Sequence, residues 1–180
     1  MTEENQTLNK KKNIFLEYVP YLFLGILFAL MIRLVISPTV VVGVSMEGSL
    51  HDGDYLIVNK LAYKTGEPKH GDVVILDSDD VPGHDIYIKR IVGLPGDTIE
   101  VKDGELVRNG KTIKEPYAKE KMESENMKMK IPEGEVFVLG DNRNNSTDSR
   151  IIGTLDYKEE VIGKAVLRVL PFDQEFKSID

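Results

Sequence analysis

The pattern of apolar and polar residues divides the chain into two parts. Residues 1–12 are polar and end in three lysines, and residues 14–36 are apolar apart from a few polar positions near the two ends of the run. A helix of about 20 apolar residues is long enough to cross a bilayer. After residue 36, the apolar residues occur in short runs separated by turn residues, a pattern typical of β-strands. The pattern therefore predicts a membrane-spanning helix followed by a β-rich body.

The predicted organisation is a cytoplasmic tail over residues 1–12, a transmembrane helix over 13–36 and an extracytoplasmic domain over 37–180. Three lysines precede the span and only Arg33 lies near its far end. The positive-inside rule therefore places the N-terminus in the cytoplasm and makes the lipid bilayer a partner. A cleavable signal peptide is the alternative. Against it, the apolar run is long and Ile36-Ser-Pro-Thr39 is not a small-x-small cleavage site.

Short strands with Gly and Pro turns are expected in the body at 40–44, 55–58, 73–76, 85–92, 98–102, 105–108, 135–139 and 162–170. The dipeptides Asp103-Gly104 and Asn109-Gly110 are hairpin signals. The segment 115–130, rich in Lys, Glu and Met, is expected to be a loop or a marginal surface helix without a chemical role. It belongs to a variable charged insert over 103–134.

Charge and composition exclude several classes of function. The chain has a net charge of −7, and residues 1–36 contain four basic and three acidic residues, so the body is acidic with a net charge of −8. Nucleic acid is therefore not expected as a partner, because phosphate binding needs clustered Lys and Arg. The absence of cysteine excludes disulfides and thiol nucleophiles. The three histidines show no metal-ligand spacing and are expected at surface or loop positions, so neither a metal nor a cofactor is implied.

Two residues are candidates for nucleophilic catalysis. Ser45 lies in the stretch Gly43–Leu50, after a run of apolar β-branched residues. A serine hydroxyl needs a base that removes its proton, and Lys89 lies in the apolar run Ile86–Val92, where burial would favour the neutral amine. From position alone, Ser45 could equally be a serine in an ordinary turn, and Lys89 a lysine that reaches solvent or pairs with an acid.

Four stretches resemble those of the bacterial type I signal peptidases, membrane-bound serine proteases with a Ser–Lys dyad. They are Ser45-Met46, Gly71-Asp-Val-Val74, Tyr87-Ile-Lys-Arg-Ile-Val-Gly-Leu-Pro-Gly-Asp97 and Gly140-Asp-Asn-Arg-Asn-Asn-Ser-Thr-Asp-Ser-Arg150. The resemblance covers roughly residues 10 to 172, including the N-terminal anchor. It implies a mainly β fold, an antiparallel β-sheet catalytic domain carried on one N-terminal transmembrane helix.

The resemblance also implies a role for each matching residue. Ser45 would be the nucleophile and Lys89 the general base. Ser146 would hydrogen-bond to the Lys89 amine and orient it. Two ion pairs would hold the last stretch beside the dyad, one between Asp148 and Arg150 and the other between Asp141 and Arg90.

The sequence departs from the family pattern at two positions. Some relatives supply a hydroxyl for the oxyanion two residues before the nucleophile, where this chain has Gly43. The second donor, beside the Ser45 N–H, would then be backbone or water. The family pattern Ser-Met-x-Pro-Thr-Leu also has a proline where this chain has Gly48. Glycine leaves the turn after the nucleophile with more conformational freedom.

The resemblance implies that the substrates are exported preproteins with small residues at the first and third positions before the cut, often Ala-x-Ala. An extended precursor segment would lie as a strand beside the nucleophile segment. Shallow apolar pockets for it are expected from residues near the dyad, namely Val41, Met46, Leu50, Tyr87 and Ile88.

The predicted function is a cell-membrane serine endopeptidase that removes signal peptides, with its catalytic domain outside the cytoplasm. A first rival hypothesis is a catalytically impaired homologue that binds precursors or peptidase partners, which Gly48 would favour. A second is an anchored β-module with a structural role in the envelope, and a third is a self-cleaving Ser–Lys regulator.

Overall fold

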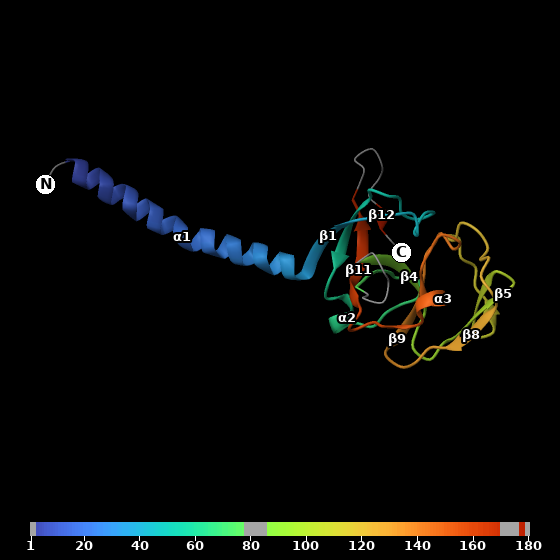
Figure 1. Cartoon of the computed structure of the whole chain (residues 1–180). Coiled ribbons are helices and arrows are strands. Elements are labelled where there is room, and N and C mark those ends of the chain that lie inside the picture. The colour runs from blue at the N-terminus through green and yellow to red at the C-terminus, as the bar shows by residue number, and fades with distance from the viewer. Residues whose placement is uncertain (1–2, 78–85, 170–176, 179–180) are drawn as a thin grey trace. The chain divides into compact units, whose positions relative to one another are not determined.

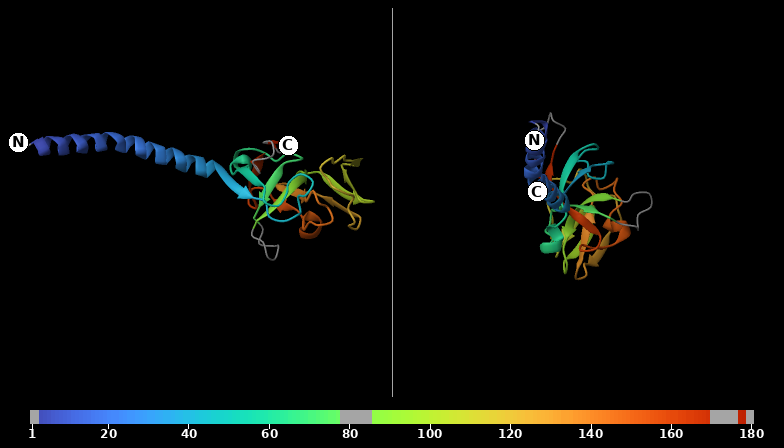
Figure 2. Two further views of the ribbon diagram at one scale, coloured as in Figure 1. Left: turned by 90° about the horizontal axis from the view of Figure 1, so that it is seen from above. Right: turned by 90° about the vertical axis from the view of Figure 1, so that its left-hand side faces the viewer.

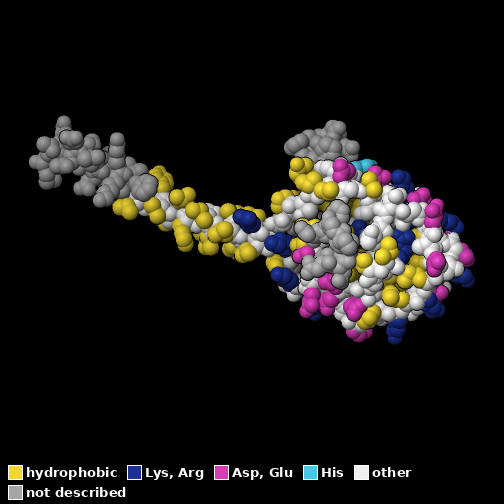
Figure 3. Space-filling model, viewed as in Figure 1, with side chains coloured by type: hydrophobic (Ala, Val, Ile, Leu, Met, Phe, Trp, Pro, Cys, Tyr) yellow, Lys and Arg dark blue, Asp and Glu magenta, His cyan; other side chains and the backbone are white. Residues whose placement is uncertain are grey.

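The structure, a computed structural model, describes residues 3–77, 86–169 and 177–178 of the 180-residue chain (Figure 1). The chain divides into two units, Met1–Ile36 and Ser37–Asp180. The first unit is formed by helix α1 (Glu3–Val35), in which Leu16–Val35 is long and apolar enough to cross a membrane. None of this span is buried, and Figure 3 shows mostly apolar side chains on the face of it in view.

The larger sheet of the second unit carries the candidate site. Its strands follow the order β1 (Ile36–Val40), β2 (Tyr55–Asn59), β11 (Val161–Arg168), β3 (Val73–Leu76), β4 (Tyr87–Gly93), β9 (Glu135–Leu139) and β10 (Leu155–Asp156), and β12 (Lys177–Ser178) pairs with β11. All pairs from β2 to β10 are antiparallel. Strands β3 and β4 are central in the sheet, and β4 is buried almost completely, including its Lys89 and Arg90.

A smaller antiparallel sheet has the order β7 (Lys111–Thr112), β6 (Glu105–Arg108), β5 (Thr98–Lys102) and β8 (Met127–Lys130). Figures 1 and 2 show it beside β9, at the end of the body far from β1 and β2. The predicted hairpin turns are confirmed. Asp103 and Asn109 have φ values of 51° and 52°, and each is followed by a glycine with φ 77°, as a type I′ turn requires.

The prediction of a mainly antiparallel β fold after one apolar helix is confirmed, with two local corrections. The expected strand at 40–44 is wrong, because β1 ends at Val40. Pro38 is accommodated inside β1 since this strand lies at the edge of the sheet. The segment 115–130 contains no helix, and its last four residues form β8. The first residue of the expected strand 85–92 and the last of 162–170 lie outside the described residues.

Two single-turn helices complete the body, α2 (Ala62–Thr65) and α3 (Ser149–Ile152).

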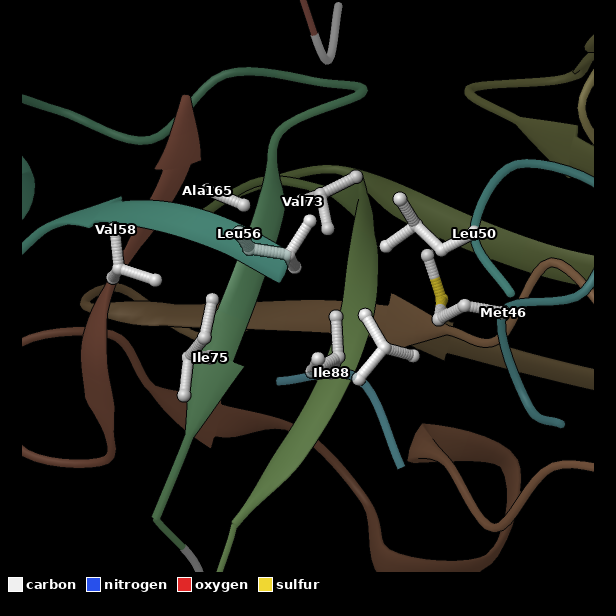
Figure 4. Close-up of a cluster of buried hydrophobic side chains, with 9 residues drawn as sticks. Met46, Leu50, Leu56, Val58, Val73, Ile75, Ile88 and Ala165 are labelled. Atoms are coloured by element: carbon white, nitrogen blue, oxygen red, sulfur yellow. The ribbon is translucent and has the colours of Figure 1, made fainter. Parts of the chain in front are cut away.

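Three clusters of buried apolar side chains support the sheets. One of them packs Met46 and Leu50 from the stretch after Ser45 against Ile88 of β4, beside Leu56, Val58, Val73, Ile75 and Ala165 (Figure 4). The core therefore fixes the backbone on both sides of the candidate nucleophile and base. Another cluster joins the smaller sheet to β9 through Phe137 and Leu139.

Replacing Phe137 by alanine should destabilise the protein strongly, because its side chain is 0% exposed and its removal leaves a cavity between the sheets. We expect the free energy of unfolding to fall by about 3–5 kcal/mol. Denaturant unfolding of the full chain in detergent measures this change. Ile151→Ala is the control, because Ile151 is 72% exposed and should change stability by less than about 0.5 kcal/mol. Equal effects of the two substitutions would contradict the assigned core.

Candidate active site

Ser45 and Lys89 meet although 44 residues separate them. The Nζ atom of Lys89 lies 2.8 Å from the Oγ atom of Ser45 and 3.1 Å from the carbonyl oxygen of Ile88. Lys89 is the third residue of β4, paired between β3 and β9, and only 3% of it is exposed. The structure thus brings the predicted nucleophile and base into hydrogen-bonding distance.

Burial controls the protonation of Lys89. Desolvation lowers its pKa to about 8, against the opposing effect of the Asp148 and Asp141 carboxylates. The neutral amine, which can accept a proton, therefore reaches half of the population near pH 8. Lys164, which also lies in a strand, differs from Lys89 because its Nζ atom lies 2.6 Å from the Asp72 carboxylate in a salt bridge.

The backbone around Ser45 is held by Asn142. The Asn142 N–H donates a hydrogen bond to the Ser45 carbonyl at 3.0 Å, and the Asn142 Nδ2 donates to the Val44 carbonyl at 3.0 Å. Asn142 is almost fully buried. Asn142 was not among the predicted site residues, although it lies in the matched stretch 140–150. Its amide carries no charge to mark it, and its partners are backbone atoms about 98 residues away.

The two ion pairs implied by the sequence resemblance are present. The Arg90 guanidinium contacts both oxygens of Asp141 at 2.9 and 2.8 Å, and Arg150 contacts both oxygens of Asp148 at 2.8 Å. Asp148 also accepts a hydrogen bond from the Gly140 N–H at 3.1 Å. Bidentate pairs fix orientation as well as charge, so the Arg90–Asp141 pair holds the stretch after β9 against β4, while the Arg150–Asp148 pair fixes that stretch internally. Their part in catalysis stays a prediction.

Ser146 corrects one expectation. Its Oγ is buried and makes no hydrogen bond with any residue that the structure describes, so the bond to Lys89 that the resemblance implied is not formed. Ser146 is nevertheless next to the site. A Cβ added at Gly140 would meet the Ser146 hydroxyl on one side and would lie 2.6 Å from the Ser45 carbonyl oxygen on the other. Lys89 instead donates to Ser45 and to the Ile88 carbonyl, which already orient its amine.

A cavity of about 630 Å³ opens beside the dyad. Its lining comes from residues 37–46 and 86–89, with Asn145 and Thr147. Four of the five residues predicted to form substrate pockets line it, namely Val41, Met46, Tyr87 and Ile88. Leu50 does not. Its N–H bonds to the Met46 carbonyl in a helical turn, and its side chain points into the core (Figure 4).

The turns around Ser45 explain both departures from the family pattern. The Gly43 N–H donates to Asp52 Oδ1 at 2.8 Å, so it is already engaged and is not a free oxyanion donor. Gly48 has a φ of +115°, which proline cannot adopt, and an added Cβ would lie 2.9 Å from the Tyr117 carbonyl oxygen. Gly48 therefore belongs to a turn with its own conformation, which a proline would disrupt.

Neither His51 nor His70 takes part in the dyad. His51 is exposed, and the Nε2 atom of His70 lies 2.7 Å from Asp97, so both occupy the expected surface positions. His84 lies outside the described residues. Within the part of the chain that the structure describes, no group of three or more acidic or histidine side chains is placed to hold a metal ion.

Known proteins similar to this chain are signal peptidases. The family profile described as "Signal peptidase, peptidase S26" matches residues 15–170. A protein named signal peptidase I from Bacillus licheniformis is 42% identical over 97% of this chain and 97% of its own length. Signal peptidase I T of Bacillus subtilis strain 168 is 39% identical, again over 97% of both chains. A crystal structure of a signal peptidase I from Enterococcus faecalis V583 is 30% identical and covers 56% of this chain and 97% of its own, with a TM-score of 0.48.

Replacing Gly140 by alanine should strongly lower the rate of catalysis at this site. The Cβ of alanine cannot fit 2.6 Å from the Ser45 carbonyl oxygen, so Ser45 or the end of β9 must shift. Displacements of about 1 Å cost roughly 100-fold in rate. We expect Gly140→Ala to lower kcat for peptide hydrolysis by about that factor. Gly25→Ala, where an added Cβ meets nothing within 4 Å, is the control. Unchanged turnover of Gly140→Ala would show that this close packing is not needed.

Proposed function

The chain belongs to the signal peptidase family, peptidase S26, and we propose that Ser45 is its nucleophile and Lys89 its general base. The family match makes it a signal peptidase I, a serine endopeptidase that removes signal peptides from secreted preproteins. The observation that carries the proposal is the 2.8 Å contact between the Lys89 amine and the Ser45 hydroxyl, made by a lysine whose pKa burial lowers to about 8.

In the proposed reaction Lys89 serves first as the base and then as the acid in both acylation and deacylation. The Ser45 Oγ attacks the scissile carbonyl while the neutral Lys89 amine accepts the hydroxyl proton. The Lys89 ammonium then gives this proton to the departing amine, and an acyl ester remains on Ser45. Lys89, neutral again, takes a proton from a water molecule that attacks the ester, and it returns this proton to the Ser45 Oγ as the acyl group leaves. The Ser45 backbone N–H is proposed to donate to the oxyanion of each tetrahedral intermediate.

Substrate selection is assigned to the cavity beside the dyad. Residues 37–46 form one wall of the cavity and residues 86–89 another, so an extended peptide between them can reach Ser45. Buried Val41, Met46 and Ile88 and partly buried Tyr87 make the lining apolar close to Ser45. We propose that this surface receives the side chains of an Ala-x-Ala sequence before the cut.

The membrane anchor supports the same function. The span Leu16–Val35 is long and apolar enough to hold the protein in the bilayer. We assign the N-terminus to the cytoplasm, because lysines precede the span and Arg33 alone lies near its far end. The catalytic domain is then outside the cytoplasm, where exported preproteins emerge with their signal peptides still in the membrane.

The rival hypothesis of a non-catalytic binding homologue rested on Gly48. In the structure, the Gly48 turn coexists with a formed contact between Ser45 and Lys89. Burying a lysine amine is energetically costly. Binding of precursors alone would not require such an amine to be held against a serine hydroxyl. The geometry therefore favours catalysis.

Cleavage of an Ala-x-Ala preprotein by the full chain in detergent tests the proposed function. The wild type should cut after the second alanine, as mass spectrometry of both products will show, and Ser45→Ala should not cut. Cleavage by Ser45→Ala at the same bond would remove Ser45 as the nucleophile. Absence of cleavage by folded wild type would favour the binding homologue.

Replacing Lys89 by arginine should nearly abolish turnover, although the positive charge is kept. A guanidinium stays protonated at any working pH and cannot accept the Ser45 proton. We expect kcat to fall by at least about 100-fold, the low end of the contribution of a general base. Lys164→Arg is the matched control, because its salt bridge to Asp72 needs only the charge. If Lys89→Arg cleaved the substrate as fast as the wild type, Lys89 would be ruled out as the base.

A further inference from the structure

The segment Glu115–Lys119, here called the clasp, packs against Arg90, the residue after Lys89, and against Gly48 in the stretch after Ser45. We propose that Glu115 and Tyr117 in the clasp are positioning residues for catalysis, an inference that rests on the proposed function. Neither residue lines the cavity where substrate is expected. Their contacts instead reach two arginines, Arg90 and Arg143, that hold the framework of Ser45 and Lys89 in place.

Both carboxylate oxygens of Glu115 accept hydrogen bonds. Its Oε2 lies 2.6 Å from Nη1 of Arg143, and its Oε1 accepts a hydrogen bond from the Tyr117 hydroxyl at 2.9 Å. The side chains of Glu115 and Arg143 are only 7% and 2% exposed. On an exposed surface such an ion pair would contribute little to stability, because water can solvate both charges. Here both side chains are buried, so water cannot take the place of Glu115 beside Arg143.

Arg143 connects Glu115 to the residues that pack around the dyad. Its Nε donates to the Gly140 carbonyl at 3.0 Å, and its own carbonyl accepts a hydrogen bond from Arg150. Gly140 packs directly against the Ser45 carbonyl and the Ser146 hydroxyl. Glu115 is the one acidic residue, among those that the structure describes, that forms a salt bridge with Arg143. Without the Glu115 charge, Arg143 would be a buried cation with no carboxylate of its own, and its Nη2 already has no hydrogen-bond partner among the described residues.

Tyr117 restrains Arg90. Its ring covers the Arg90 guanidinium at 4.1 Å, while the edge of that guanidinium bonds to Asp141, to the Gly71 carbonyl and to the Ser49 hydroxyl. Arg90 directly follows Lys89 on β4, so a fixed guanidinium limits rotation of the backbone that carries the base. The aromatic face also keeps water from Arg90, which strengthens its pair with Asp141.

Gly48 is the place where the clasp reaches the stretch after Ser45. The Tyr117 carbonyl oxygen lies where a side chain at position 48 would begin. Beside it, the Lys119 N–H bonds to the Asp141 carbonyl at 3.2 Å, and the Lys119 amine lies 3.1 Å from Glu47. The glycine that departs from the family pattern thus makes room for the clasp to dock.

Charge balance supports the same assignment. Three buried or nearly buried arginines, Arg90, Arg143 and Arg150, face three carboxylates, Asp141, Asp148 and Glu115, in one-to-one pairs. The framework around Lys89 is therefore neutral only when Glu115 is counted. Loss of one carboxylate would draw Asp141 towards Arg143, because their charges already interact, and would loosen the pair that Asp141 makes with Arg90.

The test compares Glu115→Gln and Glu115→Asp with wild type in preprotein cleavage by the full chain in detergent. We expect Glu115→Gln to lower kcat at least 10-fold and to leave KM within twofold, since the cavity is untouched. Glu115→Asp should recover part of kcat. The control is Glu105→Gln, which removes an exposed pair with Lys121 and should leave kcat unchanged. Melting temperatures are recorded for every variant, and kcat is measured well below them.

Each outcome supports or overturns the proposal. A lower melting temperature with wild-type kcat for folded Glu115→Gln would reduce Glu115 to a structural role and overturn it. If Glu115→Gln does not fold, Tyr117→Leu applies the same criteria, because it removes the ring over Arg90 but leaves the Glu115–Arg143 pair intact. Failure of wild type to cleave would instead overturn the proposed function, and this inference would fall with it.

Discussion

The hydrogen bond between the Lys89 amine and the Ser45 hydroxyl is the interaction on which the rest of the structure depends. It requires a lysine that is buried deeply enough to lose its proton near pH 8 and is aimed at one oxygen 2.8 Å away. β4 meets the first requirement, because the central antiparallel sheet buries the strand on both faces. The apolar cluster of Met46, Leu50 and Ile88 meets the second, because it fixes the backbone on both sides of the bond.

Charges near Lys89 must be compensated without forming a direct ion pair with its amine. Asp141 and Asp148 both raise the pKa of Lys89, yet each is committed to an arginine in a bidentate pair. The arginines therefore limit how far the carboxylates can stabilise the ammonium form, and desolvation remains the larger effect. The same pairs hold the stretch after β9, and Asn142 in that stretch holds the Ser45 backbone. Electrostatic tuning and positioning are thus provided by the same residues.

Sequence predicted the parts of the structure that local patterns determine. The apolar helix, most strands, the I′ turns and the contact of Ser45 with Lys89 follow from periodicity, turn residues and matched motifs. Features set by distant packing were missed. Leu50 turns into the core, Ser146 has no bond to Lys89, and the charged segment after residue 114 supplies Glu115 to Arg143. No local pattern distinguishes a glutamate that will be buried by a distant arginine from one on a solvated surface.

The most direct test of this account is the titration of the Lys89 side chain itself. NMR of the full chain in detergent, with isotope-labelled lysine and Lys89→Met to assign the signal, follows the amine from pH 6 to about pH 11. The account predicts a midpoint near 8, with the amine charged below it and neutral above it, because burial lowers the pKa of Lys89. A midpoint close to the ordinary lysine value of about 10.4 would contradict a neutral amine base at this site.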